Sequence, residues 1–137
     1  MVTLLDNKEL KSKTAQLNMP TKEFFSFKTS EGVELNGWMM KPANFNPSKK
    51  YPVIMHQYSG PGSQQVLDKW GIGSFGDGGM FEAVMCDKGY IMVCVDGRGT
   101  GGRGAAFEKC TYLSIGVKEA TDQAEAAKYL STLPYVD

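Results

Sequence analysis

The residues best suited to chemistry lie in two loops, each of which follows an apolar run. The first run, "YPVIMHQY", ends at Tyr58 and leads into a Gly-Pro-Gly turn. The second run, "YIMVCVD", leads into "GRGTGGRG", whose first glycines have the Gly-x-Gly-x-x-Gly spacing of dinucleotide-binding loops. A Tyr hydroxyl can donate a hydrogen bond to a reacting oxygen, whereas a glycine loop can turn backbone N–H groups toward a phosphate. The two loops therefore suggest two different kinds of chemistry.

The context of the glycine loop does not match a dinucleotide site. Such a site needs a loop that opens directly into a helix and an acidic residue at the end of the next strand, about 20 residues further on. Here the loop continues through Arg103, and the acids near that distance, Glu119 and Asp122, belong to a predicted helix. We interpret the glycines as a wide turn in which the backbone passes close to its neighbours. The alternative is a small α/β module that binds an anionic ligand through its glycine loops.

Three polar side chains accompany these loops. A Tyr at the end of a strand can equally leave its hydroxyl in water, so the residues alone do not decide the role of Tyr58. Asp96 and Arg98 follow the second apolar run, and we expect them to pair with each other or with loop backbone. Because ligand and catalytic loops of α/β folds lie beyond the carboxyl ends of parallel strands, both loops are predicted to border one crevice.

The surrounding pattern predicts the α/β fold class. Alternation in "FFSFK" and "VELNGWMMKP", around a turn at residues 30–32, predicts an antiparallel hairpin. An apolar run, the helical spacing of "MFEAVMCDKG" and a second apolar run then predict a parallel βαβ unit with a right-handed crossover.

Two further helices are predicted near the ends of the chain. Residues 6–17 form a short, weakly amphipathic pattern with Asp6 as the N-cap. Residues 116–134 form a longer helical pattern that Pro134 stops. The stripe expected to pack against the sheet consists of Val117, Ala120, Ala124 and Ala127.

The composition restricts the function classes. The chain has 137 residues, of which 42% are hydrophobic, and this fits one globular domain with a core. Fifteen basic residues balance fifteen acidic ones, so the charge gives no sign of nucleic-acid or anionic-membrane binding. The apolar runs are too short to span a bilayer, and the first residues lack an export signal. An export signal of a longer parent would lie upstream, so the compartment of that parent stays undecided.

The three cysteines do not suggest a metal site or a disulfide framework. Their number is odd, they show no C-x-x-C spacing, and His56 is the sole histidine that could join them. Cys86 and Cys94 lie in apolar segments and are interpreted as buried small hydrophobes, while the role of Cys110 is left open. We therefore expect no metal and no cofactor.

Four stretches carry a resemblance to a known family. In order and spacing, the chain resembles the first part of the catalytic domain in the dipeptidyl peptidase IV branch of the prolyl oligopeptidase family of serine peptidases. The most specific pieces are Y-x-G-P after the first apolar run, DGRG-x-G after the second, and D-Q-x-E-A in the last helix. The stretches are "NMPTKEFFSF", "SKKYPVIMHQYSGPGSQ", "VDGRGTGGRG" and "EATDQAEAAKYLSTLPYVD".

This resemblance implies an α/β-hydrolase fold, in which a Ser on a G-x-S-x-G elbow precedes a catalytic Asp and a catalytic His along the chain. It also implies release of Xaa-Pro or Xaa-Ala dipeptides from peptide N-termini. Tyr58 matches the family tyrosine whose hydroxyl helps to form the oxyanion hole. We expect residues 1–20 to be a linker with a short helix, and residues 21–137 to be the N-terminal portion of the peptidase domain, truncated before the elbow.

The sequence departs from the family pattern in its catalytic residues. It contains no G-x-S-x-G, because "GSFG" at 73–76 is off by one position, and His56 precedes the place of the nucleophile. The triad is therefore expected to be absent and the isolated chain inactive. The expected partners are a peptide substrate in the full-length protein and a second copy of the chain, paired through the exposed sheet edge at "VIMHQY" or through exchange of the N-terminal hairpin.

Overall fold

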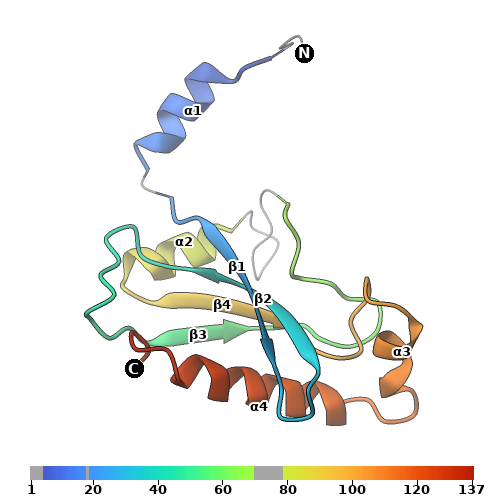
Figure 1. Ribbon diagram of the computed structural model, residues 1–137. Helices are drawn as coiled ribbons and strands as arrows, with labels where there is room; N and C mark the ends of the chain where they lie inside the picture. Colours follow the sequence, from blue (N-terminus) through green and yellow to red (C-terminus); the bar gives the residue numbers. More distant parts are fainter. Residues whose placement is uncertain (1–4, 18, 70–78) are drawn as a thin grey trace.

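The centre of the protein is a four-stranded mixed sheet with the strand order β1-β2-β4-β3 (Figure 1). The computed structural model describes residues 5–17, 19–69 and 79–137. The elements in chain order are α1 (Lys8–Ala15), β1 (Lys22–Lys28), β2 (Glu34–Met40), β3 (Val53–His56), α2 (Met80–Asp87), β4 (Ile91–Asp96), α3 (Ala105–Glu108), a short 3-10 turn (Lys109–Thr111) and α4 (Val117–Ser131).

The strand pairing follows the predicted pattern. β1 and β2 form an antiparallel hairpin in which Phe25 lies opposite Gly37. β4 pairs antiparallel with β2 and parallel with β3, and α2 connects the two parallel strands. The α/β class, the hairpin and the parallel βαβ unit are therefore confirmed. Residues just before the C-terminus continue the sheet, because Val136 forms an isolated parallel bridge with Tyr51 beside the start of β3.

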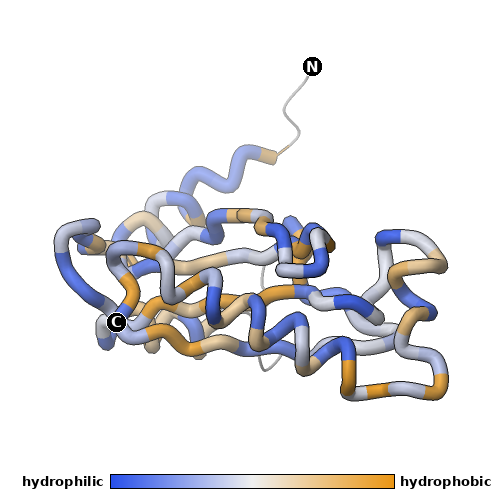
Figure 2. Tube along the Cα trace, turned by 60° about the horizontal axis from the view of Figure 1, so that its bottom comes forward, coloured by the Kyte–Doolittle hydropathy of each residue, from blue (hydrophilic) through white to orange (hydrophobic). Residues whose placement is uncertain are grey.

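Two apolar layers cover the two faces of the sheet. All six residues of β4 are buried, as expected for a parallel strand with helices on both faces. One layer packs beneath α4 and includes Leu35, Ile91 and Leu130, and the other packs beneath α2 and includes Trp38 and Met92. Figure 2 shows hydrophobic segments running through the central strands, while α1 is mostly hydrophilic. The sheet is therefore the densely packed centre from which the loops extend.

The predicted buried face of α4 is wrong. The stripe of Val117, Ala120, Ala124 and Ala127 is exposed. The buried residues of the helix are Glu119, Asp122, Ala126 and Leu130. This set has the same helical spacing, but it contains two carboxylates. Glu119 accepts the N–H group of Gly116 at the start of the helix, and Asp122 binds Arg98, which lies in a loop 24 residues earlier. A stripe chosen by hydrophobicity alone therefore selects the wrong side of the helix.

The N-terminal helix is shorter than predicted and makes little contact with the sheet. α1 buries no residue and extends away from the sheet in Figure 1. Its N-cap is Asn7, in the left-handed conformation, and not Asp6. The Asp6 carboxylate instead accepts a hydrogen bond from the Lys8 N–H group at 3.2 Å. The left-handed turn at Asn7 moves the start of the helix one residue beyond the predicted cap.

The cysteines are free thiols. Cys86 and Cys94 are buried as predicted, and burial raises the pKa of the Cys86 thiol to about 11 and that of Cys94 to about 12. Cys110 is exposed, and its thiol donates to the Phe107 carbonyl at 3.0 Å. Within the described ranges, no cluster of His, Cys, Asp and Glu could hold a metal ion, and no helix is both long and apolar enough to cross a membrane.

Candidate active site

The two loops identified in the sequence lie in contact beyond the carboxyl ends of β3 and β4 (Figure 1). We call residues 57–66 the Tyr58 loop and residues 97–104 the glycine loop. The Gly101 N–H group donates to the Ser63 carbonyl at 3.0 Å. Gly99 has a φ of +97°, and a Cβ atom there would lie 3.2 Å from the Gly60 Cα and 2.9 Å from Thr111 Cγ2. Glycine is therefore needed where the two loops cross.

The backbone N–H groups of residues 98–101 in the glycine loop are occupied by internal hydrogen bonds. Three of them donate outside the loop: Arg98 to the Asp122 carboxylate at 2.7 Å, Gly99 to Phe107 O at 3.0 Å and Gly101 to Ser63 O at 3.0 Å. The fourth, Thr100, donates to Gly97 O within the loop at 3.3 Å. These groups are not free to surround a phosphate. The loop also leads into α3, which has only four residues. Both observations favour the wide-turn interpretation over an anion-binding loop.

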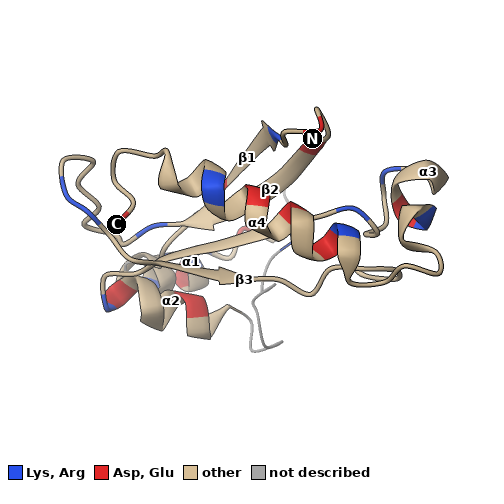
Figure 3. Ribbon diagram, turned by 90° about the horizontal axis from the view of Figure 1, so that it is seen from below, with Lys and Arg blue, Asp and Glu red and all other residues tan. Residues whose placement is uncertain are grey.

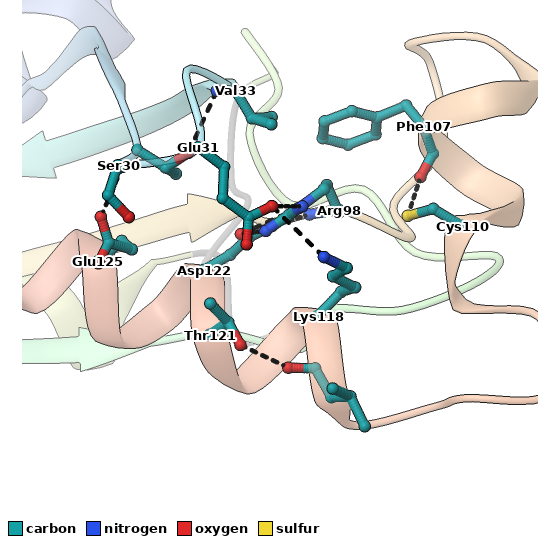
Figure 4. Close-up of polar contacts among 12 residues, drawn as sticks. Ser30, Glu31, Val33, Arg98, Phe107, Cys110, Lys118, Thr121, Asp122 and Glu125 are labelled. Carbon is teal, nitrogen blue, oxygen red and sulfur yellow. Dashed lines mark hydrogen bonds and ion pairs between the residues drawn. The ribbon is translucent and has the colours of Figure 1, made fainter.

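A buried ion pair ties the glycine loop to α4 (Figure 4). The Arg98 Nη2 atom lies 2.6 Å from Asp122 Oδ1, and Arg98 Nε lies 3.0 Å from Asp122 Oδ2. Asp122 is fully buried, and the Arg98 side chain is 9% exposed. Hydrogen bonding to Asp122 raises the pKa of the Arg98 guanidinium above its ordinary value. For Arg98, the prediction of a pair with Asp96 or with loop backbone is wrong, because the main partner of its guanidinium comes from a helix 24 residues further along the chain.

The outer side of Arg98 reaches the tip of the β1–β2 hairpin. Its Nη1 atom lies 2.6 Å from Glu31 Oε2, which also lies 3.3 Å from the Lys118 ammonium group (Figure 4). Hydrogen bonds from Arg98 and Lys118 lower the pKa of the Glu31 carboxyl group. Figure 3 shows acidic and basic residues interspersed along α4, in line with the balanced charge of the chain. Arg98 thus connects the hairpin, the glycine loop and α4.

Asp96 holds the far end of the Tyr58 loop. Its carboxylate accepts the N–H group of Gln65 at 3.0 Å and the N–H group of Val66 at 2.8 Å. The indole N–H group of Trp38 donates to the Gln65 carbonyl at 3.2 Å. Of the two partners predicted for Asp96, Arg98 or loop backbone, the structure therefore confirms loop backbone. A residue at the end of β4 fixes the loop that follows β3.

Tyr58 itself extends from this anchored loop into solvent. It lies two residues after the end of β3, and 72% of its surface is exposed. The next residue, Ser59, has a φ of 51°, and Gly60 has a φ of +87°. The Gln123 side-chain amide donates to Ser59 Oγ at 3.2 Å and to the Val95 carbonyl at 2.9 Å. The Tyr58 side chain is thus accessible to a ligand at the loop surface.

Sequence reasoning found the loops but missed the residues of α4 that support them. Asp122 and Gln123 contact the two loops, and Glu119 lies one helical turn before Gln123. Asp122 and Gln123 belong to the D-Q-x-E-A motif. Their position in that motif was the one feature of the sequence that could have indicated their contacts with the loops. Of the other residues considered, His56 is half-buried in β3, and "GSFG" at 73–76 lies outside the described residues.

The comparisons with known proteins agree on one group. The model of the prolyl oligopeptidase family matches residues 80–137. The crystal structure of Porphyromonas gingivalis dipeptidyl peptidase 4 is similar to 98% of this chain, with a TM-score of 0.85 and 47% sequence identity, and the match covers 18% of that chain.

Curated fungal proteins show the same similarity. The protein named "Probable dipeptidyl-aminopeptidase B" of Metarhizium robertsii is 36% identical over 136 residues, and that of Emericella nidulans is 40% identical over 133 residues. These matches cover 98% and 96% of this chain, respectively. The chain spans 14% of the length of each of these relatives.

Proposed function

Because this chain belongs to the prolyl oligopeptidase family of serine peptidases, we propose that it is part of a dipeptidyl peptidase of the dipeptidyl peptidase IV type. The full-length protein would release Xaa-Pro or Xaa-Ala dipeptides from peptide N-termini. In this proposal, residues 1–20 lead into the catalytic domain. Residues 21–137 supply the early part of its α/β-hydrolase fold, before the nucleophile elbow.

The position of Tyr58 is the observation that carries this proposal. Its exposed phenol follows β3 at the carboxyl edge of the sheet, beside the glycine loop. Open α/β sheets bind their ligands in this region. The order β1-β2-β4-β3 also agrees with the early strands of an α/β-hydrolase. A hydrogen-bond donor at this position is suited to an acyl-transfer reaction.

The proposed mechanism uses Tyr58 as one donor of the oxyanion hole. The hydroxyl oxygen of a Ser attacks the peptide carbonyl carbon while a His takes the proton of that hydroxyl. The carbonyl oxygen then becomes an oxyanion. The Tyr58 hydroxyl donates a hydrogen bond to this oxygen together with a backbone N–H group near the nucleophile. Because the negative charge develops during the attack, this bond strengthens in the transition state and speeds the reaction. The Ser, Asp and His are not assigned to any residue of this chain.

The activity is tested by comparing the full-length protein with the 137-residue chain. We expect the full-length protein to hydrolyse Gly-Pro-p-nitroanilide and Ala-Pro-p-nitroanilide, and a fluorophosphonate that labels active-site serines should abolish this activity. The isolated chain should release no p-nitroaniline, since its sequence contains no G-x-S-x-G. N-acetyl-Gly-Pro-p-nitroanilide, which lacks the free amino group, serves as the control substrate. Hydrolysis by the isolated chain, or resistance of the full-length protein to the fluorophosphonate, would contradict the proposal.

For the isolated chain we also propose self-association through β3. β3 is the last strand in the sheet order, and its four residues are half-buried; among the described residues, the outer edge is joined only by the Val136 bridge to Tyr51, before the strand begins. A sheet edge with unpaired backbone groups can pair with another chain. Light scattering of the purified 137-residue chain should give a mass of a dimer or a higher oligomer that grows with concentration. A constant monomer mass at the highest concentration would argue against this pairing.

A further inference from the structure

The side-chain amide of Gln123 joins the Tyr58 loop to the sheet. Its Nε2 atom donates to Ser59 Oγ at 3.2 Å and to the Val95 carbonyl at 2.9 Å. An amide nitrogen has two N–H bonds, so both of its donors are used. The amide oxygen of Gln123 is buried, with no hydrogen-bond partner among the described residues. The two donated bonds, one to the Tyr58 loop and one to β4, therefore set the orientation of this side chain.

The residue that Gln123 holds has an unusual backbone conformation. Ser59 has a φ of 51°, in the left-handed region that residues with a side chain rarely adopt. Gly60 follows with a φ of +87°, so two successive left-handed residues turn the chain directly after Tyr58. Such conformations persist when surrounding contacts determine them, and they cluster at functional sites. The direction in which Tyr58 leaves the sheet therefore depends on what holds Ser59.

The neighbouring contacts fix the other side of this turn. Gly60 packs against Gly99, and its carbonyl accepts the buried Ser63 hydroxyl at 2.9 Å. Glu119 lies one helical turn before Gln123. A Cβ atom added at Gly60 would lie 3.6 Å from Glu119 Oε1. The first turns of α4 thus lie against the turn formed by residues 59 and 60. Within this arrangement, the bond from Gln123 is the link between the Ser59 hydroxyl and the helix.

We propose that Gln123 is a positioning residue for the oxyanion donor Tyr58. The Gln123 amide would hold Ser59 in its left-handed conformation against the end of β4, and this would aim the adjacent phenol at the oxyanion. The inference rests on the proposed function, because it assumes that Tyr58 donates to the oxyanion. A displacement of about 1 Å at a reacting centre can cost about 10²-fold in rate. A residue that acts through Tyr58 should therefore affect kcat more than KM.

The test uses the full-length enzyme with Gly-Pro-p-nitroanilide. Gln123→Met keeps the length of the side chain and removes both N–H donors without adding charge. Since the loop keeps its other anchors, we expect kcat to fall by roughly tenfold, less than the ~10²-fold of a full displacement, with KM nearly unchanged. Ser59→Ala removes the acceptor and should cause a similar loss. Gln16→Met, at the exposed end of α1, is the matched control and should leave both constants unchanged.

A double-mutant cycle separates positioning from a general structural effect. Residues that act through one another give non-additive losses, whereas independent residues give additive losses. In a Tyr58→Phe background, Gln123→Met should therefore have little further effect on kcat. Should Gln123→Met fail to fold, the cycle is run with Ser59→Ala.

Three results would overturn the inference. If Tyr58→Phe lowers kcat but the Gln123 and Ser59 variants do not, or if the losses are additive, the positioning role is wrong and the proposed function is retained. If Tyr58→Phe itself leaves kcat unchanged, the proposed role of Tyr58 fails, and the role of Gln123 fails with it.

Discussion

Replacing Tyr58 with Phe in the full-length protein should lower kcat for dipeptide release by about 10²–10³-fold, the usual effect of losing one oxyanion donor. The substitution removes only the hydroxyl group of a side chain that is 72% exposed, so the fold should be retained. KM should change little, because the hydrogen bond stabilises the charge that develops in the transition state. Steady-state kinetics with Gly-Pro-p-nitroanilide measures both constants.

The matched control for this substitution is Tyr112→Phe. Tyr112 is 78% exposed and also lies in a loop, between the short 3-10 turn and α4. The chemical change is the same, so a loss of stability or expression common to surface tyrosines would affect both variants. We expect the Tyr112 variant to retain the kcat of the unmodified protein. Equal kcat values for the two variants would remove Tyr58 from the mechanism.

Replacing Asp122 with Asn should lower the free energy of unfolding of the 137-residue chain by about 3 kcal/mol, at the lower end of the effect of breaking a buried ion pair. Asp122 is fully buried and accepts hydrogen bonds from the backbone and the guanidinium of Arg98. An amide leaves the buried Arg98 charge without its main partner. Glu31 still contacts the outer side of Arg98, which limits the loss. Urea unfolding followed by circular dichroism measures the change.

An exposed ion pair provides the control for Asp122. Glu9 and Lys13 lie 2.7 Å apart on α1, and their side chains are 83% and 71% exposed, respectively. Water and salt screen such pairs, so Glu9→Gln should change the free energy of unfolding by less than about 0.5 kcal/mol. A loss for Asp122→Asn as small as that for Glu9→Gln would mean that the Arg98 contact does not stabilise the fold.

The order and type of the main elements could be predicted because they depend on local patterns. Alternation predicts the β1–β2 hairpin, and two apolar runs around a helical segment predict the parallel strands. The buried face of α4 could not be predicted in the same way, because Glu119 and Asp122 lie on it. Carboxylates are buried when they have partners, and a hydrophobic pattern does not reveal those partners.

The candidate site was predictable only in part, for a related reason. Tyr58 follows an apolar run, and the family resemblance adds its expected role. Arg98, however, finds Asp122 at a distance of 24 residues and Glu31 at a distance of 67 residues along the chain. The sheet topology and the packing of α4 bring these groups together. A residue close in the sequence, such as Asp96, was therefore a poor guide to the partner of Arg98. The contact between Gln123 and Ser59 depends on the same topology.

The most direct test of the central claim is a crystal structure of the full-length protein with a dipeptide boronate that ends in a proline boronic acid. The serine adduct of such an inhibitor is tetrahedral and carries an oxygen at the position of the oxyanion. We predict that the Tyr58 hydroxyl lies about 2.7–3.1 Å from this oxygen, as oxyanion donors do. An adduct whose oxygen is held by other donors, with the Tyr58 hydroxyl beyond hydrogen-bonding distance, would contradict the proposed role.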